Sequence, residues 1–98
     1  MRMMLRVTFQ TDMANSAIKG GAFQQVIEAM TNKLKPEAAY FMANKGCRCA
    51  MLFFDMQDAS EIPAIAEPLF AALYAEIEFQ PVMNADDLKK GLSAAMHS

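Results

Sequence analysis

Four polar residues are spaced along two short segments so that their side chains can meet around a small molecule. Arg6 and Thr8 alternate with apolar residues, and so do Glu76 and Glu78 near the other end of the chain. If the two segments are neighbouring strands, Arg6 pairs with Glu76 or Glu78 across the ladder. A structural ion pair is the simplest interpretation, because pairs of this kind are common and weak.

The alternative interpretation places these charges inside a cavity. There they orient a small ligand, and two carboxylates close together can also serve as acid and base. The spacing does not demand catalysis, so catalytic residues stay unknown and the question of an enzyme stays open. The expected ligand-binding residues are Arg6, Thr8, Tyr40, Asp55, Glu76 and Glu78.

The sequence holds two cysteines, Cys47 and Cys49, and one histidine, His97. A C-x-C pair in a strand points to one side, but a thiolate metal site takes about four ligands, and the body of the chain offers no further Cys or His. The cysteines are interpreted as small buried apolar residues, with a redox-active thiol beside Arg48 as the alternative. His97 is penultimate, where chains fray, so no catalytic or ligating role is expected. We predict no metal site and no cofactor.

The composition describes one domain, residues 1–98. Hydrophobic residues make up 54% of the chain, which is more apolar surface than a small monomer easily hides. The net charge of −2 offers no basic excess, so neither nucleic acid nor a membrane is an expected partner. The N-terminus lacks signal-peptide features, and no run approaches the ~20 apolar residues of a membrane span. The expected location is the cytoplasm, with reduced thiols.

The apolar pattern predicts strands and helices in alternation. Residues 3–10 alternate with period two, and residues 22–34 carry an apolar stripe at helical spacing that ends before Lys35 and Pro36. The expected strands cover residues 3–10, 38–43, 47–56 and 75–82, and the expected helices cover residues 22–34, 60–73 and 84–96.

Glycine and proline mark the interruptions in this pattern. The pair Gly20-Gly21 is expected to end a short helical turn that precedes the first helix. Gly46 supplies the positive φ of a hairpin turn, but a loop of two residues and one of three are both possible. This leaves open whether Tyr40 or Phe41 faces away from the helices. Pro68 is expected to kink or divide the second helix.

The element order is βαββαβ followed by a terminal helix, the ferredoxin-like arrangement of the α+β class. Its helices cover one face of a four-stranded antiparallel sheet. Residues 49–54, CAMLFF, form a central strand without a polar face, so the second face also needs a cover. The residues expected at this interface are Met4, Met51 and Phe53.

Three segments add to the element order: the hairpin turn Asn44-Lys45-Gly46, the Pro-interrupted helix of residues 66–75, and the strand-Pro-Val-acidic-helix ending of residues 76–92. In these features the chain resembles the dimeric α+β-barrel superfamily, and within it small families of unknown function. The resemblance implies a homodimer but no single chemistry, since the superfamily includes monooxygenases, isomerases and haem-handling enzymes. Its haem-handling members depend on a histidine within the body of the fold, and the haem-degrading ones also use a tryptophan, which this sequence lacks.

Three functions follow as hypotheses. The favoured one is a homodimeric α+β barrel that binds a small, mostly apolar ligand between its sheets; ten methionines suit such a lining, although they also fill cores. The second is a cofactor-free, monooxygenase-like or isomerase-like enzyme that uses the same cavity. The third is a module whose open sheet binds a different protein. RNA-recognition domains share the element order, but their base-stacking positions hold Cys47 and Cys49 here.

Overall fold

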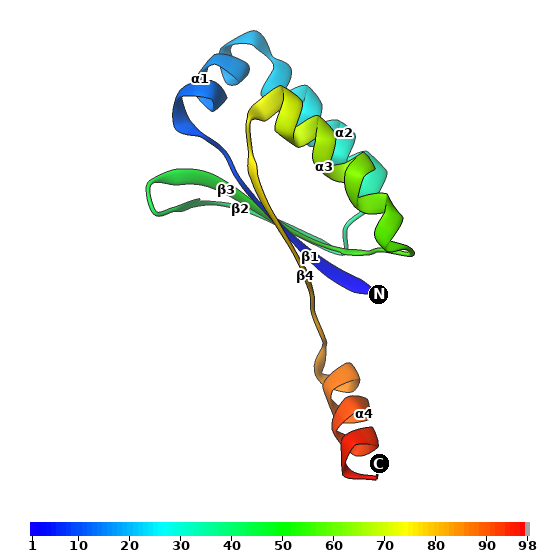
Figure 1. Cartoon of the computed structure of the whole chain (residues 1–98). Coiled ribbons are helices and arrows are strands. Elements are labelled where there is room, and N and C mark those ends of the chain that lie inside the picture. Colours follow the sequence, from blue (N-terminus) through cyan, green and yellow to red (C-terminus); the bar gives the residue numbers. More distant parts are fainter. Residues whose placement is uncertain (98) are drawn as a thin grey trace.

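A computed structural model describes residues 1–97 of the chain. Four strands and four α-helices follow one another, with a short 3₁₀ helix, η1, before α3 (Figure 1). The elements are β1 (Arg2–Thr8), α1 (Thr11–Gly20), α2 (Ala22–Leu34), β2 (Ala38–Asn44), β3 (Cys47–Asp55), η1 (Ala59–Glu61), α3 (Ile62–Leu73), β4 (Glu76–Pro81) and α4 (Ala85–Met96).

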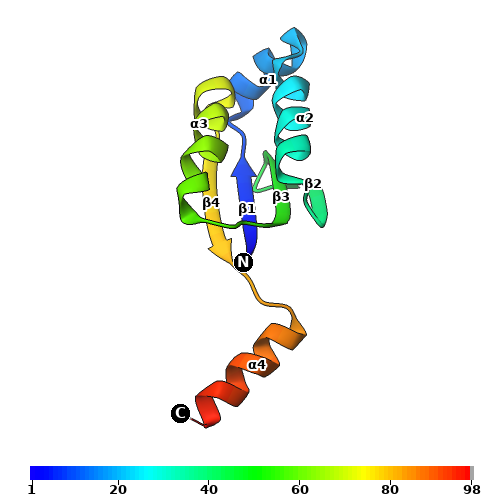
Figure 2. The ribbon, with the colours of Figure 1, turned by 90° about the vertical axis from the view of Figure 1, so that its right-hand side faces the viewer.

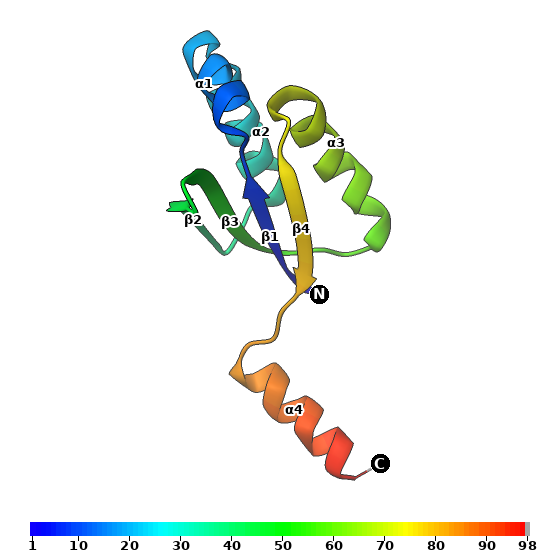
Figure 3. The same ribbon diagram turned by 60° about the vertical axis from the view of Figure 1, so that its left-hand side comes forward.

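The four strands form one antiparallel sheet in the order β2-β3-β1-β4. Figure 2 shows α2 and α3 side by side over one face of this sheet, while α1 lies beyond the end of β1 (Figure 3). The ferredoxin-like α+β fold expected from the sequence is therefore confirmed, with β3 and β1 in the centre and β2 and β4 at the edges.

The core fills the space between the sheet and the helix layer. Alternate residues of β1 and β3 point into it, as the period-two pattern predicts, and the apolar stripes of the helices pack against them. The rings of Phe9 and Phe23 meet edge to face, with centroids 4.9 Å apart. The largest fully buried side chains are Val7, Leu5, Phe9, Leu52, Met56, Leu69 and Leu73.

The segment before Gly21 differs from the expectation. Instead of a short turn, Thr11–Gly20 forms a helix of ten residues, α1, whose Ala14 is fully buried. Thr, Asp, Asn and Ser favour turns and helix starts alike, so composition could not separate the two. Gly21 then takes the left-handed conformation, with φ 80°, and separates α1 from α2 as the glycine pair predicted.

The β2–β3 hairpin closes with a two-residue loop. Asn44 lies opposite Cys47, and the loop residues Lys45 and Gly46 both have positive φ, 53° and 80°. Two positive φ angles are characteristic of a type I′ turn, which matches the twist of the strands it joins. The register that results places Tyr40 opposite Met51.

The helix around Pro68 is not divided, because α3 runs from Ile62 to Leu73 with this proline inside. Its entry is fixed by η1, whose capping box joins Asp58 and Glu61. Asp58 is thus the N-cap residue of η1.

The C-terminal helix stands apart from this body (Figures 1 and 3). It follows β4 and begins with the expected capping box, in which Asn84 and Asp87 accept hydrogen bonds from each other's backbone. The molecule is consequently elongated, with extents of 55 × 28 × 18 Å. None of the helices formed by residues 1–97 is both long and apolar enough to cross a bilayer.

Candidate functional site

One face of the sheet carries no helix, and we call it the helix-free face. Residues directly opposite each other in an antiparallel ladder share a face, so the pairing of β1 with its neighbours defines its members. Met4 lies opposite Phe53, Arg6 lies between Met51 and Glu78, and Thr8 lies opposite Glu76.

Every residue expected to bind a ligand or form an interface belongs to this face, although the sequence placed them in two groups. The register brings together Met4, Arg6, Thr8, Tyr40, Met51, Phe53, Asp55, Glu76 and Glu78. Their shared face is a structural finding; their roles in binding stay predictions.

The side formed by β2 and β3 is apolar. Tyr40 is 61% exposed and Met42 is 37% exposed, while Met51 and Phe53 beside them are half-buried. Cys49, opposite Met42 on the same face, is buried. A contiguous apolar surface of this kind on a small domain marks an interaction site.

The side formed by β1 and β4 is polar. Arg6 Nη1 lies 3.9 Å from Glu78 Oε2, so the expected pair forms with Glu78, while Glu76 faces Thr8. Both partners are partly exposed, and an ion pair with this separation contributes about 0–1 kcal/mol to stability. The pair therefore adds little to folding and leaves a cation and a carboxylate beside the apolar side.

A second group of charges lies at the end of the face where β1 begins. The N-terminal ammonium of Met1 lies 2.7 Å from Asp55 Oδ1 and lowers the pKa of this carboxyl group by hydrogen bonding and by its charge. Arg2 contacts Glu37 at 2.5 Å and Asp87 at 3.1 Å, and the hydrogen bond to Glu37 raises the pKa of Arg2. These contacts tie the sheet end to the start of α4.

Asp55 is consequently not brought together with the other polar residues. It lies opposite Arg2, four residues along β1 from Arg6, which corresponds to about 13 Å along a strand. The pair Met4 and Phe53 lies between them. Asp55 lies on the helix-free face, as expected, but its partner is the N-terminal ammonium of Met1 at the end of the sheet.

At the opposite end of the face lies an open hollow of about 500 Å³, lined by both polar and apolar groups. It contains Thr8 and Glu76. It adds Cys47, which the sequence offered only as a redox-active thiol, and Tyr74, which the sequence did not indicate as a site residue. Tyr74 ends α3 in the left-handed conformation, with φ 51°. It follows no strand or helix period, so alternation could not assign it to a face.

The two cysteines lie on the same face, as the C-x-C spacing predicts, and both are free. Cys49 is buried and Cys47 is half-buried, so the interpretation as buried apolar residues holds fully for Cys49. His97 caps the end of α4, away from the sheet. Within residues 1–97, no cluster of three or more His, Cys, Asp or Glu side chains is arranged to hold a metal ion.

The ferredoxin-like fold by itself does not define an activity, because many functions share it. A scan against protein-family models and a search of curated proteins each gave no match. Function must therefore be inferred from the helix-free face.

Proposed function

We propose that two copies of the chain pack helix-free face against helix-free face, as a dimeric α+β barrel that holds a small, mostly apolar ligand between the sheets. The observation that supports this most directly is the apolar side of the face, where Tyr40, Met51 and Phe53 lie on the side of the sheet away from the helix-covered core. Two sheets packed in this way lie about 10 Å apart, close enough for their side chains to interdigitate. A second copy is self-complementary under a twofold axis.

Burial of the apolar side supplies a driving force for association. Covering roughly 300–500 Å² of apolar surface per chain is worth about 7–12 kcal/mol before the costs of association, at about 25 cal/mol per Å². Both partners contribute the same residues, so each substitution on the face acts twice in the dimer.

The distribution of side chains supports a ligand with an apolar body and a polar end. Binding sites for small molecules are largely apolar with a few placed polar groups, and the helix-free face combines both. Met42 and Met51 offer flexible, polarizable contacts on the apolar side. Arg6 and Glu78 supply one donor group and one acceptor group next to them.

A cofactor-free, monooxygenase-like or isomerase-like enzyme is the second candidate. It is favoured by the hollow that gathers Thr8, Cys47, Tyr74 and Glu76 at the end of the face, which in the proposed dimer lies at the barrel mouth. A module that binds a different protein through the same face is the third. With two free thiols, the proposal keeps the cytoplasm as its expected compartment.

Two neighbouring aromatic residues of β2 provide the test. Tyr40 and Phe41 are 61% and 58% exposed but point to opposite faces of the same edge strand. We expect the wild-type chain to sediment as a dimer at micromolar concentration, Tyr40→Asp as a folded monomer, and Phe41→Asp as a dimer. A wild-type monomer, or a Tyr40→Asp dimer as tight as that of the wild type, would show that the helix-free face is not the interface.

A further inference from the structure

The helix α4 presents an apolar stripe that its own chain leaves uncovered. Every residue from Ala85 to Met96 is exposed, including Leu88 at 47% and Leu92 at 57%. Together with Met96, these side chains follow i, i+4 and i+8 and lie on one side of the helix. A helix of twelve residues is marginal in water without a packed apolar face, even with a well-formed capping box.

The accessible surface area of the chain indicates how much surface a partner can cover. The accessible surface is 6635 Å², whereas a compact monomer of 10.8 kDa exposes about 5,500 Å². The radius of gyration is 15.7 Å, against about 13 Å for a compact domain of this length. The excess of roughly 1,100 Å² is comparable with the ~800 Å² that each partner buries in a standard stable interface.

The stripe is continuous with the helix-free face. A hollow of about 390 Å³ at the junction of β4 and α4 is lined by Leu88 and by Gln80, and Gln80 lies opposite Met4 on that face. Arg2, also on that face, contacts Asp87 in the first turn of α4. Figure 1 shows α4 beyond the end of the sheet and away from α2 and α3. The start of the stripe therefore lies next to residues of the helix-free face.

We infer that α4 is an exchanged arm, whose stripe of Leu88, Leu92 and Met96 packs on a second copy of the same chain. The backbone supports a position of α4 away from its own helix layer. Val82 N donates a hydrogen bond to Arg2 O, and this bond prolongs the β1–β4 ladder to within two residues of Asn84, the N-cap of α4. By twofold symmetry each chain then donates one arm and receives one. This inference rests on the proposed dimer and specifies what completes its interface.

The test compares two aspartate substitutions on α4 in the full chain. Leu92→Asp places a charge in the stripe, whereas Ala94→Asp places the same charge on the other side of the helix. We expect Leu92→Asp to raise the dimer dissociation constant about a hundred- to ten-thousandfold, because each of the two arms in the dimer loses one well-buried leucine. Ala94→Asp should leave the constant unchanged, and sedimentation equilibrium measures both.

An NMR sample that mixes isotope-labelled and unlabelled wild-type chains identifies the chain on which the arm packs. Cross-chain NOEs from the Leu92 methyl groups are the expected result. NOEs confined to one chain, or their complete absence, would overturn the inference. If Tyr40→Asp dissociates the dimer while Leu92→Asp does not, the inference about α4 is wrong and the proposed sheet interface stands. If Leu92→Asp dissociates the dimer while Tyr40→Asp does not, α4 packs on the second copy but the helix-free face is not the interface.

Discussion

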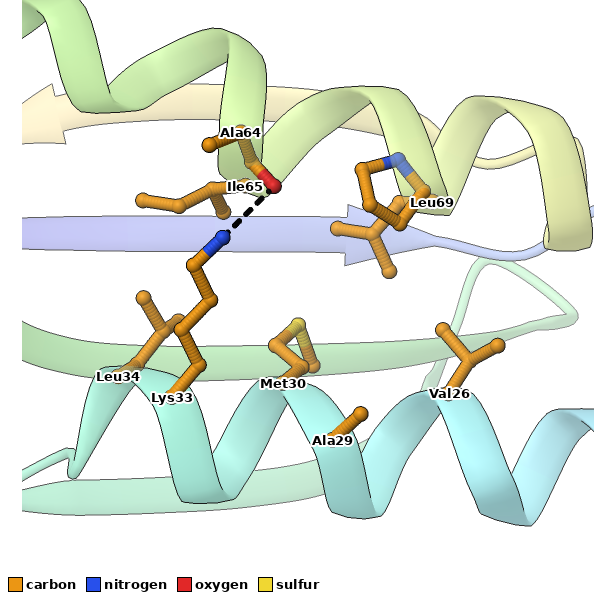
Figure 4. A pocket seen from close by; sticks show the side chains of 9 residues that line it. Val26, Ala29, Met30, Lys33, Leu34, Ala64, Ile65 and Leu69 are labelled. Carbon is orange, nitrogen blue, oxygen red and sulfur yellow. Dashed lines mark hydrogen bonds between the residues drawn. The ribbon is translucent and has the colours of Figure 1, made fainter.

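The ammonium group of Lys33 donates a hydrogen bond to the carbonyl oxygen of Ala64, 3.1 Å away (Figure 4). Ala64 precedes Pro68 by four residues, so its carbonyl is the acceptor that the missing proline N–H leaves without a helical donor. A side chain of α2 thus replaces a backbone group of α3. The contact spans a groove of about 130 Å³ between the two helices, and it accompanies a helix that continues through its proline.

Replacing Lys33 should expose this compensation. We expect Lys33→Met to lower the free energy of unfolding by about 0.5–1.5 kcal/mol, the usual net value of one hydrogen bond. In the Pro68→Ala background, a backbone N–H at position 68 can supply the donor, so the same substitution should cost clearly less. Urea denaturation at one fixed protein concentration measures the cycle, and equal losses in both backgrounds would contradict the assignment.

Two adjacent phenylalanines of β3 should respond in opposite ways to the same charge. Phe54 is 2% exposed in the core, so Phe54→Asp is expected to unfold the domain, at a cost above about 4 kcal/mol. Phe53 lies on the helix-free face, and Phe53→Asp should keep the circular dichroism spectrum while the dimer dissociates. A Phe53→Asp variant that unfolds as Phe54→Asp does would mean that the face belongs to the core of the single chain.

The ion pair on the helix-free face should matter for a ligand more than for folding. Because Arg6 and Glu78 are partly exposed and 3.9 Å apart, Arg6→Gln is expected to change the unfolding free energy by less than about 1 kcal/mol. If Arg6 orients the polar end of a ligand, the variant should lose small molecules that the wild-type dimer retains. Native mass spectrometry of both proteins gives this comparison. Identical bound masses would remove Arg6 from the site.

Acid should weaken the start of α3 through Asp58. Its carboxylate accepts a hydrogen bond from Ser60 N at 2.9 Å, and this bond lowers the pKa of Asp58 below its ordinary value. A lowered pKa in the folded state means that the contribution is present above the unfolded pKa of about 3.9 and is lost as pH falls through the folded pKa.

Asp58→Asn is the matched variant, because asparagine also caps helices but does not titrate. The loss of stability between pH 6 and 3, measured by urea denaturation, should therefore be smaller for Asp58→Asn than for the wild type. Equal losses would assign the acid sensitivity to other carboxyl groups.

Strand alternation was enough to predict which residues of β1 and β4 share the helix-free face. Period two in residues 3–10 and 75–82 fixes the facing of Arg6 and Glu78 once β1 and β4 are neighbours. The hairpin register was beyond this logic, because Asn44-Lys45-Gly46 suits loops of two or three residues. The two-residue loop requires a positive φ at Lys45, and a lysine does not by itself predict this conformation.

The remaining parts of the site depend on conformations without a period. Tyr74 lines the hollow together with Thr8 because the end of α3 takes a left-handed conformation. The polar residues that begin α1 are equally typical of turns, so they did not predict a helix. Asp55 illustrates the converse limit. Its face was predictable, but its N-terminal partner is distant in sequence and left no local pattern.

Strand β2 is an edge strand, and none of its seven residues, AAYFMAN, carries a charge. Unpaired backbone groups along such an edge can accept a strand from any other molecule, and charged or proline residues are the usual protection. The opposite edge ends in Pro81. When the protein is concentrated or partly unfolded, aggregation should therefore begin at β2, and an added lysine at its solvent side should make the protein more soluble.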